Sequence, residues 1–499
     1  MVNGMVFFRY NLLTVLTTNP IIVKSFSSGK EVLMMKGKRN SQRYQSRREF
    51  LKQSLYTGLN ASLAGSLLLS SCGKKQTARK TTNIILISID TLCAAHLGCY
   101  GYKRPTTPTL DKLASEGMLF EDVSAPSPWT LPAHASLLTG LYPNRNGLKS
   151  HFKYLPDDVV TWAEVLREHG YLTAAIINSH NLSNRYGLDR GFDDFTYVKE
   201  SLKLAEPTKV EAKAHEWLSK HNGKPFFLFL HYYDVHSDYH SLPQYEKQFA
   251  RPYQGRADGS TRQLLYFRDG LFSLDDNDAK HLIDLYDAGI RQMDDGMARL
   301  FALLEEKDLL DNTLIIVTSD HGEEFLEHGG VLHGRTQFQE LIHVPLLIRG
   351  PGIPHSKRLR HIASLVDVMP TILTLLGISP PASLDGINLC PLWQKSNAQL
   401  PQRFIFAEAD HNNAIHDVKR AIRHQQYKLH YDRSTKEAQL YNLSDDPEEK
   451  VDVAHKHTQL VDTMLSSLKD FMNISKTGRA LGSLSPEEIK SLKSLGYLQ

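Results

Sequence analysis

Residues 130–140 read Thr-Leu-Pro-Ala-His-Ala-Ser-Leu-Leu-Thr-Gly and say more about the fold than any other stretch of the chain. The pattern predicts a short helix that begins at Thr130 and ends at Gly140. Pro132 falls in the first turn, where its missing N–H costs no hydrogen bond, and Gly140 can take the left-handed conformation that ends a helix. Thr130 therefore lies at the positive end of a helix dipole, where an alkoxide or an anionic ester is stabilised. On its own, a threonine at this position is expected only to cap the helix.

This stretch resembles the signature of the sulfatases, a family within the alkaline phosphatase superfamily. Its members carry five consecutive positions: first Cys or Ser, then any residue, then Pro, then Ser or Ala, and then Arg. An apolar run that ends in Thr-Gly follows. In true sulfatases the Cys or Ser is oxidised to formylglycine. Here Thr130 occupies that position and His134 occupies the position of the Arg. Threonine has no route to formylglycine, so the resemblance implies a variant with Thr130 itself as the nucleophile, as in phosphoryl-transferring relatives.

The resemblance extends from about residue 83 to about residue 454, in the order and spacing of the family. It implies an α/β fold of the alkaline-phosphatase type, with a mostly parallel sheet flanked by helices and a smaller C-terminal α+β subdomain. The other segments that carry it are residues 83–92, 96–102, 107–111, 191–193, 318–324, 344–352, 365–371 and 440–443, with Asp446, Pro447 and Glu449.

Apolar runs of strand length alternate with amphipathic stretches of helix length through the middle of the chain. Such alternation is typical of a mostly parallel sheet covered by helices. We expect strands at 84–89, 173–177, 226–231, 314–318 and 345–348, and helices at 111–116, 159–169 and 276–306. The pattern changes after about residue 377, and two strands are expected at 420–431 and 437–443. We therefore predict a catalytic domain at 83–385, a C-terminal subdomain at 386–460 and a helical tail at 461–499.

Polar residues follow several of the expected strands, at the edge where ligands of open α/β sheets bind. Asp90 ends one strand, Asp320 and His321 follow another, and residues 231–236 follow a third. The resemblance implies that Asp90, Thr130, Asp320 and His321 bind one divalent metal ion. Calcium, usual in sulfatases, prefers oxygen ligands. The imidazole, and Thr91 where many relatives have a second Asp, favour zinc, manganese or another transition ion.

Further candidates for proton transfer and for binding the anionic group are His180, His236, His333 and Arg335. The resemblance implies a substrate-contacting role for His236 and for His180. The family Lys two residues before His180 is Asn178 here. Arg335 can supply part of the missing charge, because a guanidinium binds sulfate or phosphate bidentately. His134 is expected to support the nucleophile's loop, as the family Arg does.

The first 71 residues are predicted to be an export leader. Residues 46–52, Ser-Arg-Arg-Glu-Phe-Leu-Lys, match a twin-arginine signal, and residues 69–72, Leu-Ser-Ser-Cys, resemble a lipoprotein cleavage box. We therefore expect a bacterial lipoprotein that is cut before Cys72, lipidated there and followed by a tether at 72–82. Initiation at Met34 or Met35 would give a leader of more usual length. The expected location is the periplasm or the cell surface, anchored to a membrane.

The net charge argues against one class of binding partner, and the number of cysteines bears on disulfide bonding. Residues 1–71 hold ten Lys or Arg and two acidic residues, which leaves 48 basic and 53 acidic residues, about −5, in 72–499. Nucleic acid is not an expected partner, since it needs a basic patch on the folded part. If Cys72 is lipidated, three cysteines remain, and an odd number argues against a disulfide framework while leaving one bridge open.

The predicted function is metal-dependent hydrolysis of an anionic ester by a sulfatase-type enzyme with Thr130 as nucleophile. The substrate would be a small anionic ester, or a sulfated or phosphorylated glycan or lipid headgroup. Two alternatives stay open. The first is an enzyme that hydrolyses phosphodiesters or phosphonates, or that transfers a phosphoglycerol-type headgroup. The second is a non-catalytic binding protein on the same fold.

Overall fold

The computed structural model describes residues 82–199, 207–220, 223–395, 398–411, 417–482 and 484–494. The chain divides into two units, residues 1–77 and 78–499, and the fold is that of the second. The predicted leader, the lipidation site at Cys72 and nearly all of the tether lie outside the described residues. Among the described helices, none is both long and apolar enough to cross a membrane.

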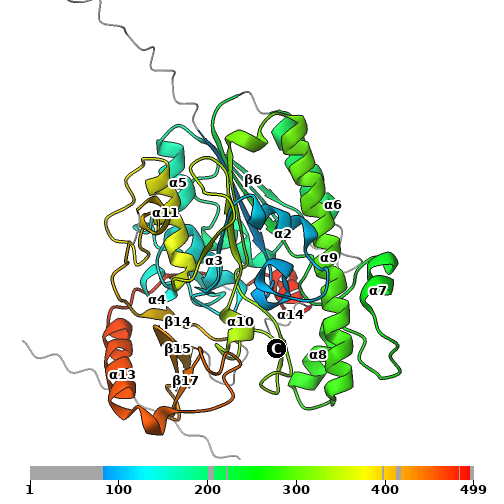
Figure 1. Ribbon diagram of the computed structural model, residues 1–499, viewed down its shortest axis with the longest axis vertical. Coiled ribbons are helices and arrows are strands. Elements are labelled where there is room, and N and C mark those ends of the chain that lie inside the picture. The colour runs from blue at the N-terminus through cyan, green and yellow to red at the C-terminus, as the bar shows by residue number, and fades with distance from the viewer. Residues whose placement is uncertain are drawn as a thin grey trace, which may run out of the picture. The chain divides into compact units, whose positions relative to one another are not determined.

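An eight-stranded sheet forms the centre of the fold (Figure 1), in the order β12-β2-β11-β8-β1-β7-β5-β6. β1 pairs in parallel with β7 and with β8, and β5 pairs in parallel with β6 and β7. Only β11 runs antiparallel to both of its neighbours, β2 and β8. The predicted mostly parallel α/β sheet is thereby confirmed. Its strands are β1 (Asn83–Ile89), β2 (Met118–Phe120), β5 (Leu172–Ile177), β6 (Asp194–Tyr197), β7 (Phe226–Tyr232), β8 (Thr313–Thr318), β11 (Leu346–Arg349) and β12 (Lys357–Leu359).

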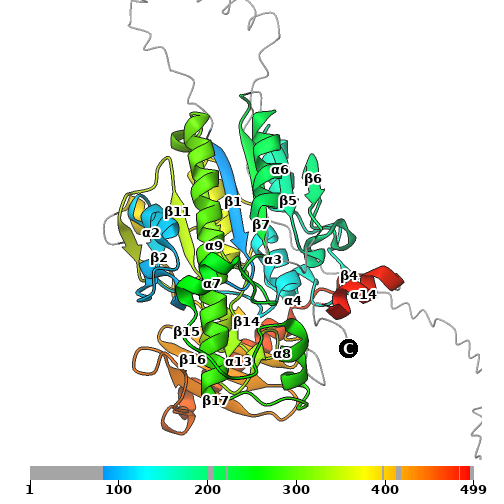
Figure 2. The same ribbon diagram turned by 90° about the vertical axis from the view of Figure 1, so that its right-hand side faces the viewer.

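Helices cover both faces of this sheet, which explains why its central strands are apolar without interruption. Successive β1 residues enter different cores: Ile84 packs in one with Trp162, and Ile85 packs in the other with Met293. Figure 2 shows α6 and α9 lying along the sheet on one side. The helices of that side are α2 (Pro108–Ser115), α6 (Pro207–Ser219) and α9 (Asp276–Glu306), and those of the other are α3 (Thr130–Thr139), α5 (Trp162–Glu168) and α11 (Val368–Leu375).

The observed helix ends confirm one expected pair of boundaries and correct two others. α3 begins at Thr130 and ends at Gly140, whose φ is 66°, as expected; Trp129 occupies the cap position and Thr130 is the first helical residue. α2 starts earlier than residue 111 because Pro108 fits the first turn. α5 starts later than residue 159 because Thr161 and Glu164 form a capping box.

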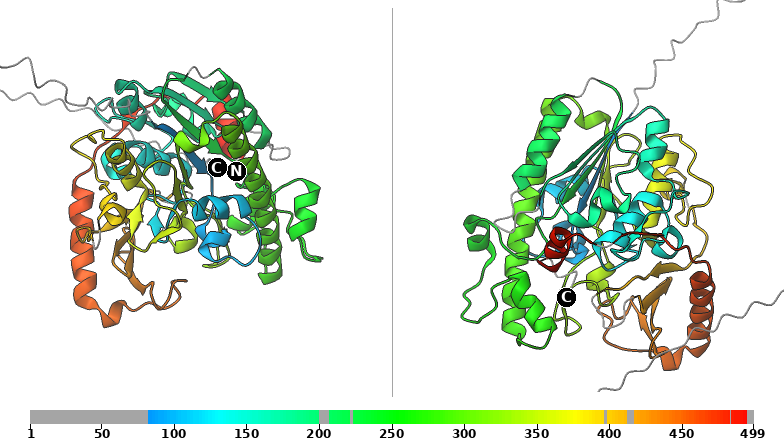
Figure 3. Two further views of the ribbon diagram at one scale, coloured as in Figure 1. Left: turned by 45° about the horizontal axis from the view of Figure 1, so that its top comes forward. Right: turned by 180° about the vertical axis from the view of Figure 1, so that it is seen from behind.

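The C-terminal subdomain contains a four-stranded antiparallel sheet, β14 (Ile405–Ala407), β15 (Lys419–His424), β16 (Tyr427–Asp432) and β17 (Ala438–Asn442). The single strand expected at 420–431 is wrong, since the chain reverses at Gln425, whose φ is 52°. α13 (Thr458–Asn473) buries Met464 and Leu468 against this sheet. Figure 3 shows this subdomain in orange and red.

Shorter elements connect these parts of the fold. They are β3 (Val123–Ser124), β4 (Lys153–Tyr154), β9 (Glu324–Phe325), β10 (Val331–Leu332), β13 (Ala363–Ser364), β18 (Arg479–Ala480), α4 (Pro143–Asn146), α7 (Pro243–Phe249), α8 (Thr261–Arg268), α10 (Gln339–Ile342), α12 (Pro391–Gln394) and α14 (Pro486–Ser494). The three cysteines of the described part, Cys93, Cys99 and Cys390, are free thiols, so they form no bridge with one another.

Candidate active site

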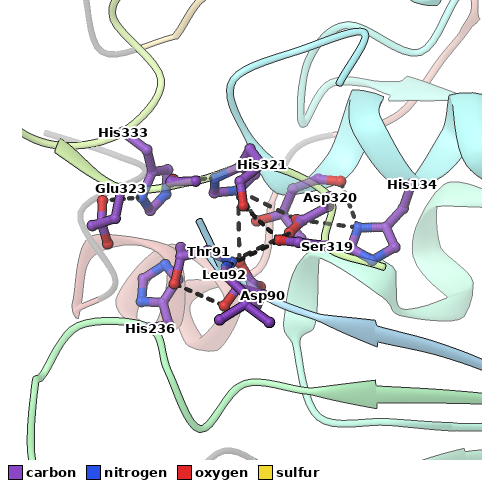
Figure 4. A network of polar contacts seen from close by, with 12 residues as sticks. Asp90, Thr91, Leu92, His134, His236, Ser319, Asp320, His321, Glu323 and His333 are labelled. Atoms are coloured by element: carbon purple, nitrogen blue, oxygen red, sulfur yellow. Dashed lines mark hydrogen bonds and ion pairs between the residues drawn. The ribbon is translucent and has the colours of Figure 1, made fainter. Parts of the chain in front are cut away.

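The candidate site lies at the carboxyl ends of three adjacent strands, β8, β1 and β7. Asp90 directly follows β1, and Asp320 and His321 follow β8. Within the described part of the chain, these three form the one group of His, Cys, Asp or Glu side chains placed to hold an ion, with ligand atoms within 4.8 Å of one another. Figure 4 shows the two carboxylates and the His321 ring turned toward one another.

The donor atoms of this group fit a divalent cation. His321 Nε2 lies 3.3 Å from Asp320 Oδ2, 3.6 Å from Asp90 Oδ1 and 3.4 Å from Thr130 Oγ1. Ligands that each lie about 2.0–2.2 Å from one tetrahedral ion have similar mutual distances. Both carboxylate oxygens of Asp90 and Oδ2 of Asp320 are buried and accept no hydrogen bond from the described residues. Buried carboxylate oxygens without a partner are costly, and a cation would satisfy them.

The pKa shifts of these three side chains also favour a bound cation. Burial raises the pKa of Asp90 to about 7. Burial and the nearby charge of Asp90 raise the pKa of Asp320 well above its ordinary value. Burial lowers the pKa of His321, and its Nδ1–H donates to the Gly322 carbonyl at 2.9 Å. The neutral ring therefore turns the lone pair of Nε2 toward the carboxylates, as a metal ligand must.

His134 lies between the start of α3 and Asp320. Its Nδ1 lies 2.9 Å from the Thr130 carbonyl and 3.3 Å from Asp320 Oδ2. Because a carbonyl only accepts, Nδ1 carries the proton and Nε2 accepts from the Ser88 hydroxyl at 2.9 Å. Burial and the neighbouring His231 ring lower the pKa of His134. The residue at the position of the family Arg is therefore a neutral hydrogen-bonding group.

His231, which the sequence places at the ligand-binding end of a strand without a specific role, belongs to the same site. Its Nδ1 is 3.0 Å from Asn178 Oδ1, and its Nε2 is 3.4 Å from Asp90 Oδ2. It pairs in register with Ser88 of β1, so its position at the carboxyl end of β7 was the signal that could have found it. Asn178, which replaces the family Lys, thus forms a neutral hydrogen bond behind Asp90.

On the opposite side of the carboxylates from His134, Figure 4 shows His236, His333 and Glu323. His333 Nδ1–H donates to Glu323 Oε1 at 2.9 Å, and the His333 ring lies 4.4 Å from that of His321 and 4.9 Å from that of His236. His236 Nδ1–H donates to the Ser237 carbonyl at 2.7 Å, and burial lowers the pKa of His236. Sequence reasoning missed Glu323, although it closely follows Asp320 and His321.

The two remaining candidates are half-buried. His180 begins a 3-10 turn (His180–Leu182) after β5, with its ring 6.3 Å from that of Tyr186, and burial lowers its pKa. Arg335 follows β10 and His333 in the chain. Burial and the positive charge of Arg268 lower the pKa of Arg335. The roles assigned to His180 and Arg335 stay predictions.

Relatives at similar length show what the chain resembles. It is 25% identical to arylsulfatase K of Gallus gallus, over 87% of this chain and 91% of that protein. It is 24% identical to N-acetylglucosamine-6-O-sulfatase of Bacteroides thetaiotaomicron, over 81% and 90%. Among solved structures, one holding its substrate D-glucosamine-2-N,6-O-disulfate aligns with TM-score 0.68 and 22% identity, over 79% of this chain and 98% of that one. Phosphonate monoester hydrolase of Agrobacterium radiobacter aligns with TM-score 0.64 and 20% identity, over 79% and 95%.

Two family models match the chain. The model for the C-terminal part of N-sulphoglucosamine sulphohydrolase matches residues 327–474. The sulfatase model matches residues 82–378, more than half of the chain, and so includes every member of the Asp90, Asp320 and His321 group. The chain belongs to the sulfatase family and is a sulfatase-type hydrolase.

Proposed function

We propose that this enzyme removes a sulfate ester from a glycan and that Thr130 Oγ1 is the nucleophile. The observation that carries the proposal is the position of this hydroxyl, 3.4 Å from His321 Nε2 at the start of α3, beside two buried carboxylates. The glycan substrate is supported by the relatives, one named for an N-acetylglucosamine 6-O-sulfate and one solved with a disulfated glucosamine.

Asp90, Asp320 and His321 would hold one divalent cation, with Thr130 as the fourth ligand. A cation bound there supplies positive charge that favours ionisation of the hydroxyl and offsets the charge of the ester. His134 Nδ1–H donates to the Thr130 carbonyl, and the same nitrogen lies 3.3 Å from Asp320 Oδ2 without a hydrogen bond to it. The backbone of the nucleophile is therefore held beside one metal ligand before substrate arrives, which favours a short, aligned approach of the reacting atoms.

Two displacements at sulfur account for the reaction. In the first, the ionised Thr130 oxygen bonds to sulfur, the bond from sulfur to the glycan oxygen breaks, and His333 donates a proton to that oxygen. Glu323 stabilises the protonated His333 ring through Nδ1–H. In the second, water attacks the sulfur, His333 takes its proton, and the Thr130 oxygen leaves. Neutral His236 stands beside His333 as an acceptor for a substrate hydroxyl or for water.

Thr130 also favours a second candidate, hydrolysis of a phosphate or phosphonate ester. A sulfated threonine lacks the second hydroxyl by which formylglycine expels sulfate, so water must displace it directly. Phosphorylated intermediates are cleared in this way. The fold is shared with a phosphonate monoester hydrolase, which makes the comparison of the two ester classes the decisive assay.

The test uses purified protein with matched p-nitrophenyl sulfate, p-nitrophenyl phosphate and phenylphosphonate monoester, each with Ca²⁺, Mn²⁺ or Zn²⁺. We expect sulfate turnover that Thr130→Ala abolishes and Thr130→Ser partly retains. Mass spectrometry of rapidly quenched protein should locate an adduct on Thr130. Turnover of phosphate or phosphonate alone would discard the sulfate proposal in favour of the second candidate, and full activity of Thr130→Ala would discard the nucleophile.

We further propose that the chain is a lipoprotein, exported by the twin-arginine route and anchored through Cys72. The support is the twin-arginine signature at 46–52 and the cleavage box at 69–72. Metabolic labelling with a palmitate analogue should tag the wild-type protein and not Cys72→Ser, while Cys390→Ser serves as the matched control. Labelling that survives Cys72→Ser would reject the anchor.

A further inference from the structure

The segment that carries His333 is held in place by residues that lie outside the eight-stranded sheet. Residues 328–339, the His333 loop, contain β10, His333 and Arg335 and lead into α10. The ring of His328 stacks on that of Phe338 with centroids 3.6 Å apart and planes 1° apart. The two ends of the loop are therefore in contact, and the stack closes its base.

His328 is bonded through both ring nitrogens. Nδ1 lies 2.6 Å from Glu340 Oε1, and Nε2 lies 3.3 Å from the Glu449 carbonyl oxygen. Because a carboxylate and a carbonyl both only accept, both nitrogens carry protons. Burial opposes that charge, but the hydrogen bond and the charge of Glu340, together with the hydrogen bond to the Glu449 carbonyl, outweigh burial and raise the pKa of His328. One end of the loop is thus fixed to the backbone of Glu449.

The other end of the loop is fixed to the same residue. The carboxylate of Glu449 accepts from the Gln339 backbone N–H at 2.7 Å. It also accepts from Lys428 Nζ at 3.0 Å and from His430 Nε2 at 2.7 Å, two residues of β16. Lys428 Nζ reaches the Gln339 side chain as well, at 3.1 Å. Despite burial, Lys428 and His430 hold the pKa of Glu449 at about 2, so its carboxylate is ionised at neutral pH. The contacts of Glu449 with both ends of the His333 loop are called the clamp below.

We infer that Glu449 is a positioning residue through which the C-terminal subdomain sets the place of His333. The residue belongs to the C-terminal signature of the sequence, to which no part of the proposed chemistry gave a role. Its carbonyl holds one end of the His333 loop and its carboxylate holds the other. The proposed cation ligands Asp90, Asp320 and His321 lie on other segments, at the ends of β1 and β8. Loss of the clamp should therefore displace His333 and leave the cation site intact.

This inference rests on the proposed role of His333 as the proton donor to the leaving oxygen. A misplaced general acid slows only those reactions whose leaving group needs the proton. A nitrophenolate leaves without one, whereas the alkoxide of a sugar does not. The size of the defect should therefore depend on the leaving group, and a purely structural defect would slow both substrates alike.

Two variants of the full chain, called the clamp variants below, loosen the hold on the His333 loop in different ways. The double variant Lys428→Met with Glu449→Leu removes both buried charges together, because loss of one partner would leave the other uncompensated. Phe338→Ala opens the base of the loop without changing any charge. Glu448→Leu, at the exposed neighbouring position, is the matched control, and His333→Gln defines the effect of losing the acid itself.

The assay compares p-nitrophenyl sulfate with glucosamine 6-sulfate, and hydrogen–deuterium exchange reports on residues 328–339. For both clamp variants we expect faster exchange in the loop, an unchanged shift of Tm on Mn²⁺ addition, and a loss of kcat/KM on the saccharide. That loss should be at least about tenfold larger than on the nitrophenyl ester, a part of the roughly 100- to 10,000-fold that a general acid contributes.

Several results would overturn the inference, and they tell its own failure apart from failure of the proposed function. If His333→Gln shows the leaving-group pattern and neither clamp variant does, the inference fails and the proposed function stands. If His333→Gln slows both substrates alike, the proposed role of His333 fails and the inference fails with it. A clamp variant that slows both substrates equally, or leaves exchange in the loop unchanged, also counts against it.

Discussion

The metal-free protein should lose stability as pH rises, and a divalent cation should restore it. The cause is Asp90, whose pKa is raised by burial from an ordinary 3.8 to about 7 in the folded protein. Between these two values the folded state binds more protons than the unfolded state, so the free energy of unfolding falls with increasing pH. The contribution is fully present below about pH 4 and lost as pH rises through 7. A difference of about three pKa units corresponds to about 4 kcal/mol.

Asp320 adds to the same trend, since its pKa is raised by burial and by Asp90. A bound cation favours both ionised carboxylates and should therefore remove this part of the pH dependence. It should also bind more weakly as pH falls below 7, because each proton that it displaces weakens binding by about tenfold per pH unit.

Chemical denaturation between pH 4 and pH 8, with chelator and with Mn²⁺, measures the effect. Asp234 provides the matched control, because burial raises its pKa to about 7 and it lies outside the proposed ligand set. Asp234→Asn should reduce the pH dependence equally with and without cation, whereas Asp90→Asn should remove the difference between the two conditions. Stability in chelator that rises between pH 5 and pH 8, or a wild-type curve that Mn²⁺ leaves unchanged, would refute the reasoning.

Three further predictions follow from the site and the core. Thr130→Ala should reduce kcat to background and keep a shift of Tm on Mn²⁺ addition, as measured by steady-state kinetics and thermal melts; loss of the shift as well would mean that the hydroxyl is needed mainly for cation binding. His231→Ala should weaken Mn²⁺ binding in calorimetry by up to about tenfold, because the His231 ring lies 3.4 Å from Asp90 Oδ2 and limits the positions open to that carboxylate, and an unchanged Kd would show that Asp90 needs no such support. Leu86→Ala, at a fully buried position, should lower the free energy of unfolding by about 2–5 kcal/mol, and a loss below 1 kcal/mol would show that the core closes around the gap.

Much of the fold was predictable because the hydrophobic pattern of the central strands agrees with the residues that mark where each element ends. The run before Asp90 is buried on both faces, and parallel sheets covered by helices require such continuous apolar strands. The 276–306 helix was predicted at its observed bounds, since Asp275 caps it with a capping box. The break at Gln425 was missed because no glycine or proline marks that turn.

The site was predictable to the extent that its residues stand at strand ends or helix starts. Asp90 and His321 follow adjacent strands, so strand order brings them together, and Thr130 is found by its place at the start of α3. His231 was placed at a strand end but given no role, and Glu323 was missed, because hydrogen bonds to Asn178 and His333 set the orientation of these side chains and no spacing in the chain encodes those bonds. The clamp at Glu449 was harder still to predict, since it joins the His333 loop to a sheet whose strands come much later in the chain.

Anomalous diffraction from crystals soaked in Mn²⁺ tests the central claim most directly. We expect one strong peak among Asp90, Asp320 and His321, within coordination distance of Thr130 Oγ1. A crevice without a peak at saturating Mn²⁺, or a peak bound by other residues with Thr130 turned away from it, would contradict the account.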